Sequence, residues 1–354
     1  RRRRGAAGAL LEARGRGAYV VRRCRRGMVR TEIHDEVETR RRLPFRGQGL
    51  WRAFKPIAIA ILALLLLYYP IGMIWVHQID DDIDFVAPTS DLGAGASAVV
   101  AMAAALIDRE VNQHRWVAND PFFEPPNLLD NMPNYQQGII GALARFAFEL
   151  TDQIGRTRGS SQTDPDLQEA AGLLQYSGTK WIFDFSTSIA PTATSEAQYR
   201  KARRSLIDYN QRLAAGEAVF ERRADNLLAT LDRIALDLGS SSAVLDRRIA
   251  EHAGAILDFQ ADDLFYGVKG QVYAYYMLVR ELGHDFDKVI RERELEAAWG
   301  QLLDSMRQVV ELDPWVVVNG APDGQFLPNH LAAQGFYLLR ARTQLREITN
   351  ILLK

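Results

Sequence analysis

An uncharged stretch of 21 residues, from Pro56 to Val76, limits most strongly what this chain of 354 residues can fold into. A helix of that length reaches about 31 Å, which matches the roughly 30 Å hydrocarbon core of a bilayer. A secretory signal would have an apolar region of only about 7 to 15 residues, followed by small residues at a cleavage site. Here the bulky sequence "WVHQ" follows. The sequence therefore predicts a retained transmembrane helix at 56–76.

Basic residues precede this stretch and acidic residues follow it. Residues 1–55 contain 17 Lys and Arg against 5 Asp and Glu, whereas the rest of the chain contains 26 against 39. Because cytoplasmic flanks are enriched in Lys and Arg, we expect a basic cytoplasmic arm at 1–55 and an acidic, flexible stalk at 77–95 beyond the membrane. The C-terminal domain is therefore expected on the far side of the membrane, outside the cytoplasm.

The first 27 residues differ in composition from the rest of the arm. Twenty of them are Arg, Gly or Ala, and the first Met is Met28. We therefore expect translation in the cell to begin at Met28, so that 1–27 would not be native. A mitochondrial-type presequence is the rival interpretation, but such leaders are rich in Ser and this segment has none.

Residues 96–354 are expected to form one α-helical periplasmic domain. This segment contains no cysteine, so its fold depends on a hydrophobic core rather than on disulfides. Apolar residues recur in steps of three and four from Phe220 to Ile256, which predicts one long helix from about Glu217 to Asp258. Similar stripes follow, and no long stretch alternates with period two. The predicted class is all-α, a multi-helix bundle ectodomain on a single N-terminal transmembrane helix.

Several motifs, in order along the chain, resemble those of a known bacterial family. They are "LLDNMPNYQQG", "FERRADNLLATL", "DDLFYGVKGQVYAYYML", "HDFDKVI" and the closing "NGAPDGQFLPNHLAAQGFYLLRARTQLREITNILL". The chain is similar, from about Ala58 to its end, to the family named domain of unknown function 2333, or DUF2333. The resemblance implies a Gram-negative inner-membrane protein with one span, so that the predicted location is the bacterial inner membrane, with the C-terminal domain in the periplasm. The mitochondrial inner membrane is the alternative. The resemblance brings no assigned catalytic residues.

Polar and aromatic residues in two loop regions form the candidate ligand site. Amide and carboxylate groups beside aromatic rings are the residue types that hold sugars or peptides, because they combine directional hydrogen bonds with stacking. The alternative interpretation is loop architecture, since Asn and Asp also cap helices and close turns. The candidate residues are Asp130, Asn131, Asn134, Tyr135, Asn319, Asn329 and His330.

No cofactor, metal or catalytic residue is predicted. The cluster His284 to Asp287 contains metal-ligating residue types, but Gly283 before it indicates a helix end at which acids act as caps. The sequence lacks the HExxH, GxSxG and CxxC motifs. Enzyme classes that depend on these motifs are therefore disfavoured.

Two classes of function remain open. The first is a membrane-anchored periplasmic interaction or scaffold module, with the lipid bilayer and either itself or another envelope protein as partners. The alternative is a periplasmic enzyme or binding protein for cell-wall glycan, which would need two carboxylates about 5 to 10 Å apart in a cleft. Nucleic acid is excluded as a partner, because the domain beyond the span is acidic overall.

Overall fold

The computed structural model describes residues 47–76, 78–88, 93, 95–125, 130–155, 163–183, 190–252, 254 and 258–354, with side chains from Phe54. The basic arm up to residue 46, including 1–27, lies outside these residues. The described chain is all-α and forms no sheet, as the sequence predicts. Its α-helices are α1 (Gly47–Val76), α2 (Ala98–Asp108), α3 (Asn131–Glu149), α4 (Pro165–Leu174), α5 (Ser195–Ala215), α6 (Ala224–His252), α7 (Phe259–Asp285), α8 (Asp287–Glu292), α9 (Glu296–Val310) and α10 (His330–Leu352). Two π-helical turns, η1 (Arg109–Gln113) and η3 (Leu150–Ile154), extend α2 and α3.

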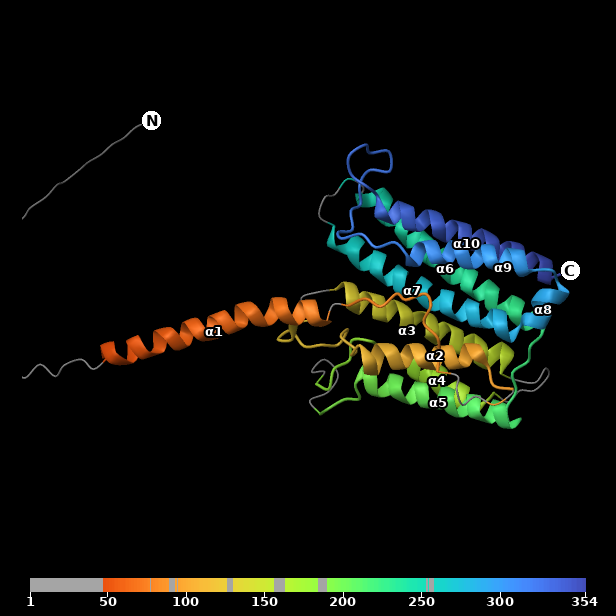
Figure 1. Ribbon diagram of the computed structural model, residues 1–354, viewed down its shortest axis with the longest axis horizontal. Coiled ribbons are helices and arrows are strands. Elements are labelled where there is room, and N and C mark those ends of the chain that lie inside the picture. The colour runs from red at the N-terminus through yellow and green to blue at the C-terminus, as the bar shows by residue number, and fades with distance from the viewer. Residues whose placement is uncertain are drawn as a thin grey trace, which may run out of the picture. The chain divides into compact units, whose positions relative to one another are not determined.

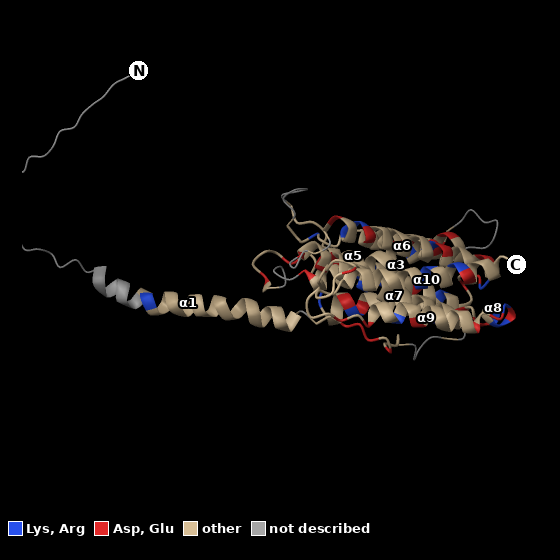
Figure 2. Cartoon of the chain, turned by 90° about the horizontal axis from the view of Figure 1, so that it is seen from above, with Lys and Arg blue, Asp and Glu red and all other residues tan. Residues whose placement is uncertain are grey.

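Helix α1 contains the apolar stretch predicted at 56–76. The segment Phe54–Val76 is long and apolar enough to cross a membrane, with a mean hydropathy of 2.5 and none of its most apolar window buried. Figure 2 shows α1 without a charged residue after Lys55. The chain divides into two compact units at Pro56, and only the first turns of α1 belong to the described part of the first unit.

The bundle has three layers of helices (Figure 1). Helices α3 and α7 lie in the middle, α2, α4 and α5 pack on one side, and α6, α9 and α10 pack on the other. Large side chains fill the space between the layers, and Tyr135, Tyr199, Phe265 and Tyr273 are each at most 1% exposed. A chain without cysteine in this domain is therefore held together by a continuous core, as the composition predicts.

The central helices α3 and α7 run parallel and touch through their backbones. Asn134 donates to Asp263, and four residues later the chain of Gly138 lies against Gly267. A Cβ at Gly138 would lie 2.2 Å from the carbonyl oxygen of Gly267, and a Cβ at Gly270 would lie 2.0 Å from that of Tyr135. These positions require glycine because any side chain would force the two helices apart.

The long apolar stripe of α6 is buried within the bundle. Leu227, Leu231, Ile234, Leu238 and Leu245 are at most 2% exposed, and α6 packs mainly against α10. The helix is shorter than the predicted range from Glu217 to Asp258, but it continues through the Gly and Ser cluster at 239–242. From Leu227 to Leu245 the stripe is thus covered by helices of the same chain.

Polar side chains cap the starts of three helices in the bundle. Asn329 caps α10 by accepting a hydrogen bond from the Ala332 amide at 2.8 Å. Thr194 caps α5 in the same way, and Asp258 caps α7.

Candidate functional site: the acidic strap

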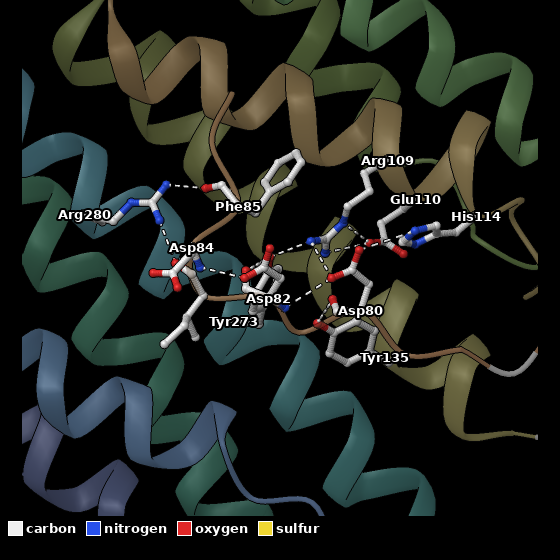
Figure 3. A network of polar contacts seen from close by, with 11 residues as sticks. Asp80, Asp82, Asp84, Phe85, Arg109, Glu110, His114, Tyr135, Tyr273 and Arg280 are labelled. Atoms are coloured by element: carbon white, nitrogen blue, oxygen red, sulfur yellow. Dashed lines mark hydrogen bonds and ion pairs between the residues drawn. The ribbon is translucent and has the colours of Figure 1, made fainter. Parts of the chain in front are cut away.

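The segment from Asp80 to Phe85, here called the acidic strap, lies along the bundle between α2, α3 and α7 (Figure 3). The sequence predicts a flexible stalk over 77–95, and for these six residues the structure differs from that prediction. The hydroxyls of Tyr135 and Tyr273 donate to the carbonyls of Asp80 and Asp82, both at 2.8 Å. Extended backbone needs partners for its carbonyls, and here the bundle supplies them.

The other end of the acidic strap is held by Arg280. Its guanidinium donates to the carbonyl of Ile83 at 2.7 Å and to that of Phe85 at 2.6 Å. The residues of α7 that contact the acidic strap therefore lie in order along the helix, from Lys269 through Tyr273 to Arg280. The acidic strap runs in the same direction as α7, because later residues of the strap are bound by later residues of the helix.

The carboxylates of the acidic strap form ion pairs with the bundle, and they also close turns within the strap itself. Asp81 pairs with the ammonium of Lys269 at 2.6 Å, and Asp80 lies 3.5 Å from Arg109 and 3.4 Å from His114. The carboxylates of Asp80 and Asp82 also accept bonds from amides two residues ahead, at 3.1 and 2.9 Å. Such local turns are typical of aspartate. These aspartates therefore determine both the local turns of the acidic strap and its attachment to the bundle.

Arg109 lies at the centre of the contacts between the acidic strap and the bundle, and it is only 1% exposed. Its guanidinium is between two rings, 4.9 Å from the centre of Phe85 in the strap and 4.7 Å from that of Tyr273 in α7. Glu110, which is completely buried, pairs with it at 2.8 Å. A cation between aromatic faces with a carboxylate partner keeps its charge in a dry site.

The pKa values of this pair are shifted by burial and by each other. Burial raises the pKa of Glu110 above its ordinary value of 4.5, and the neighbouring Arg109 charge offsets part of that rise. Burial alone would lower the pKa of Arg109, but the Glu110 charge, with Tyr273, Tyr135 and Asp80, keeps it above its ordinary value. Arg109 therefore remains a fixed cation, and the strap residues Asp80 and Phe85 complete its surroundings.

A π-helical turn places Arg109 and Glu110 in this position. Beside the turn η1, the buried amide of Gln136 donates to the carbonyls of Glu110 at 3.1 Å and Arg115 at 2.9 Å. Its oxygen accepts from the amide of Val117 at 3.1 Å. Arg115 has a φ of 65°, in the left-handed region. Such turns are frequent at functional positions.

The predicted site residues near the start of α3 meet the start of α7. Asn134 donates to Asp263 at 2.8 Å, and the amide of Asn131, oriented to donate, reaches Asp262 at 2.6 Å and Asp130 at 3.1 Å. Burial and the neighbouring carboxylates raise the pKa values of Asp262 and Asp263 to about 6. Tyr135 belongs instead to the acidic strap, where it binds the Asp80 carbonyl.

The other predicted residues close the loop before α10. Asn319 donates to the carboxylate of Asp258 at 3.3 Å, and Asn329 donates to the oxygen of Asn319 at 3.1 Å. His330 Nδ1 accepts from the amide of Val318 at 2.9 Å, and burial lowers the pKa of His330. These contacts follow the alternative interpretation, loop architecture. None of the contacts among the described residues links this group to Asp130, Asn131 or Asn134.

Asp285, from the cluster His284 to Asp287, caps a distant helix. Its carboxylate accepts from the hydroxyl of Ser97 at 2.7 Å and from the amide of Val99 at 3.0 Å, at the start of α2. A carboxylate at a helix N-terminus is favoured by the helix dipole. Among the residues that the structure describes, no group of three or more His, Cys, Asp or Glu side chains could hold a metal ion.

Sequence analysis missed the residues that bind the acidic strap. Lys269 carried a signal, because it is the single charge in the largely apolar and aromatic stretch of α7 from Leu264 to Val279, and such a charge needs a buried partner. Arg109 and Glu110 likewise follow directly on the apolar run of α2. No such signal marked the partners, which lie 29 or more residues away in the strap.

The fold and the acidic strap define the class of protein: an all-α bundle bound to the segment that follows one apolar, membrane-length helix. Residues 48–255 and 257–354 match the family DUF2333, described as an uncharacterised protein conserved in bacteria. The chain belongs to this family. No curated protein and no solved structure matches it.

Proposed function

We propose that this chain is a single-span protein of the bacterial inner membrane whose periplasmic helical domain acts as an interaction or scaffold module at the membrane surface. One observation carries this proposal. The acidic strap binds the bundle from Asp80 onward, only four residues after the apolar helix ends at Val76. Four residues reach at most about 14 Å. A domain tied so closely to a span works next to the bilayer.

The charges on either side of the span support the orientation. Arg40, Arg41, Arg42, Arg46, Arg52 and Lys55 precede it, and four aspartates follow it between residues 80 and 84. The bias of basic residues places the N-terminal side in the cytoplasm. Membership of a bacterial family favours the bacterial inner membrane over the mitochondrial one.

A groove between α3, α4 and α6 is the surface that we propose for a protein partner. Its volume is 560 Å³, and Gly141, Arg145, Phe148 and Arg233 are among the residues that line it. Phe148 in α3 is 53% exposed and Leu236 in α6 is 64% exposed. Exposed apolar side chains beside arginines are typical of interaction surfaces. The partner is another envelope protein or a second copy, although the buried stripe of α6 is not the contact.

Labelling in spheroplasts tests the orientation. The variant Ser240→Cys in a Cys24→Ser background presents a thiol at an exposed position of α6 and should react with a membrane-impermeant maleimide. Ser305 is 1% exposed, so Ser305→Cys is the matched control and should react only after denaturation. Protection of Ser240→Cys until the membrane is permeabilised would refute the periplasmic location.

Crosslinking in intact membranes tests the interaction module. A photoreactive group placed at Phe148 should give a covalent adduct with one partner, and the same group at exposed Thr343 in α10 is the control. Mass measurement of the adduct distinguishes a second copy from another protein. A monomer without adducts at Phe148 would count against this function.

Glycan binding or hydrolysis is the second candidate, because three carboxylates meet at the starts of α3 and α7. The pKa values of Asp262 and Asp263 are raised to about 6 beside Asp130, which suits general acid and base catalysis near neutral pH. Purified protein should then cleave cell-wall fragments, and Asp130→Asn should abolish the cleavage. An unchanged rate in Asp130→Asn would exclude this site as the catalytic one.

A further inference from the structure

Exposed aromatic side chains gather on loops at one end of the bundle. Trp315 is fully exposed at 101%, Phe326 is 94% exposed, Phe122 is 80% exposed and Phe259 is 74% exposed. Among the described bundle residues eight Phe and Trp side chains are exposed, and six of them lie on these loops or at the first residue of α7. Leaving such side chains in water forgoes the favourable free energy of burying them. A surface of this kind indicates contact with an apolar partner.

These loops adjoin the first residues of the acidic strap. The loop 114–125 begins at His114, which lies 3.4 Å from the carboxylate of Asp80. The loop 311–329 is held by Lys269, which donates to the carbonyl of Leu312 at 2.8 Å and pairs with Asp81. Figure 1 shows both loops at the end of the bundle where α3, α7 and α10 begin.

A third segment, 175–183, joins the same end. Asn119 donates to the carbonyl of Lys180 at 2.9 Å, and the rings of Phe123 and Trp181 are 6.2 Å apart. Phe183, on the same segment, stacks edge-on against Trp181 with ring centres 5.5 Å apart. The aromatic side chains thus occupy several neighbouring loops rather than one groove.

The chain itself keeps this end of the bundle close to the span. Asp80 is fixed to the bundle and follows Val76 by four residues, a reach of about 14 Å at most. The headgroup layer of a bilayer is itself about 5 to 8 Å thick on each side of the hydrocarbon core. Loops beside Asp80 and Asp81 are therefore within reach of the headgroups.

We propose that the loops carrying Trp315, Phe326, Phe122 and Phe259 dock on the lipid surface and insert these rings into the headgroup region. This inference rests on the proposed function, because it requires α1 to span the membrane. Aromatic rings are favoured at the membrane interface, where an apolar body meets a polar layer. The occupant of this end of the bundle is the bilayer that the span already crosses.

The charges on these loops indicate which lipids take part. The loop residues are more acidic than basic, so attraction to anionic headgroups cannot be the source of binding. Docking depends on apolar insertion and suits zwitterionic lipid such as phosphatidylethanolamine. The acidic residues are Asp120, Glu124, Glu311, Asp313 and Asp323, and the basic ones are Arg115 and Lys180.

The experiment uses the full-length chain in liposomes of phosphatidylcholine and phosphatidylethanolamine. In a Cys24→Ser background, single cysteines replace Trp315, Trp75 at the span end, or Thr343, and each carries an environment-sensitive fluorophore. Thr343 is an exposed control on α10, about 20 Å along the helix from its start. Lipids with a nitroxide near the headgroup then quench any fluorophore that touches the bilayer.

We expect the label of Trp315→Cys to be quenched about threefold more strongly than that of Thr343→Cys, as interfacial insertion requires. Quenching of Trp75→Cys with no excess at Trp315→Cys would overturn the docking and leave the span intact. Absence of quenching at Trp75→Cys would overturn the proposed function and this inference with it. A spectral shift at Trp315→Cys that grows with protein density, without lipid quenching, would assign the surface to a second copy.

Lipid composition and salt give an independent test. Because the loops are more acidic than basic, replacing a third of the lipid by anionic phosphatidylglycerol should not increase the quenching of Trp315→Cys, and salt should not abolish it in zwitterionic liposomes. A steep rise with anionic lipid that salt reverses would overturn apolar insertion as the means of docking.

Discussion

Gly270 has no side chain because the backbone of α3 occupies the place where one would be. The carbonyl oxygen of Tyr135 lies 2.0 Å from the position of a Cβ at Gly270, and the conflicting atom is backbone. Gly141, also in a helix, has no atom within 4 Å of the corresponding position. Two glycines in the paired central helices thus meet opposite surroundings.

Gly270→Ala should lower the free energy of unfolding by about 1 to 3 kcal/mol or more, because α3 and α7 must separate. Gly141→Ala should be neutral or raise it by up to about 1 kcal/mol, since alanine favours the helix. Urea unfolding followed by circular dichroism measures both. A Gly270→Ala variant as stable as Gly141→Ala would show that the helices are not in backbone contact.

Arg109→Met should destabilise the protein by about 3 to 5 kcal/mol, because it leaves the carboxylate of Glu110 buried without its cation. The double variant Arg109→Met with Glu110→Gln removes both charges and should recover part of that loss. Urea unfolding measures the free energy of unfolding of both variants. Equal stability of the single and double variants would contradict a coupled buried pair.

At the scale of elements, the acidic strap covers two buried cations of the bundle. Without it, Lys269 loses Asp81, and Arg109 loses both Asp80 and the Phe85 ring. The strap thus functions as an element of the fold.

A fragment of residues 78–354 should therefore unfold at a higher temperature than one of residues 96–354, by roughly 2 to 4 °C for each kcal/mol lost. Adding a peptide of residues 78–88 to the shorter fragment should restore part of the difference, and the same peptide with its four aspartates replaced by asparagine should not. Equal melting temperatures of the two fragments would show that the strap contributes nothing to stability.

Patterns of neighbouring residues predicted the helices, whereas the acidic strap is bound through contacts between residues that are far apart in sequence. The stripe of Leu227 to Leu245 and the cap Asn329 follow from neighbouring residues, so the sequence was enough to predict them. The acidic strap was interpreted as a hydrated stalk because its partners, Arg109, Lys269 and Arg280, are far away in sequence. A run of aspartates has the same sequence pattern whether its side chains face water or buried cations.

At the scale of the whole molecule, several carboxylates are less acidic in the fold than in the unfolded chain. Burial raises the pKa values of Asp120, Asp262 and Asp263 from 3.8 to about 6. Between pH 4 and 6 the folded protein therefore holds more protons than the unfolded chain, and these groups make stability fall as the pH rises through this window.

Asp262→Asn should make the free energy of unfolding fall less steeply as the pH rises. Above pH 6 the free energy of unfolding of the variant should exceed that of the wild type by on the order of 1 kcal/mol, after allowance for solvent screening. Asp246→Asn, at an exposed position of α6, is the matched control and should leave the profile unchanged. Urea unfolding at a series of pH values between 4 and 7 measures the difference. Parallel profiles for Asp262→Asn and the wild type would contradict the raised pKa.

The direction of the acidic strap also determines how the molecule responds to mechanical load. A pull transmitted from the span enters at Asp80, and the contacts of Tyr135, Lys269, Tyr273 and Arg280 follow one another along the line of α7. A pull directed back along that line loads these bonds side by side, in shear, so they share the force rather than peel one by one. In the membrane-anchored arrangement proposed above, the attachment would therefore resist tension between the domain and the bilayer.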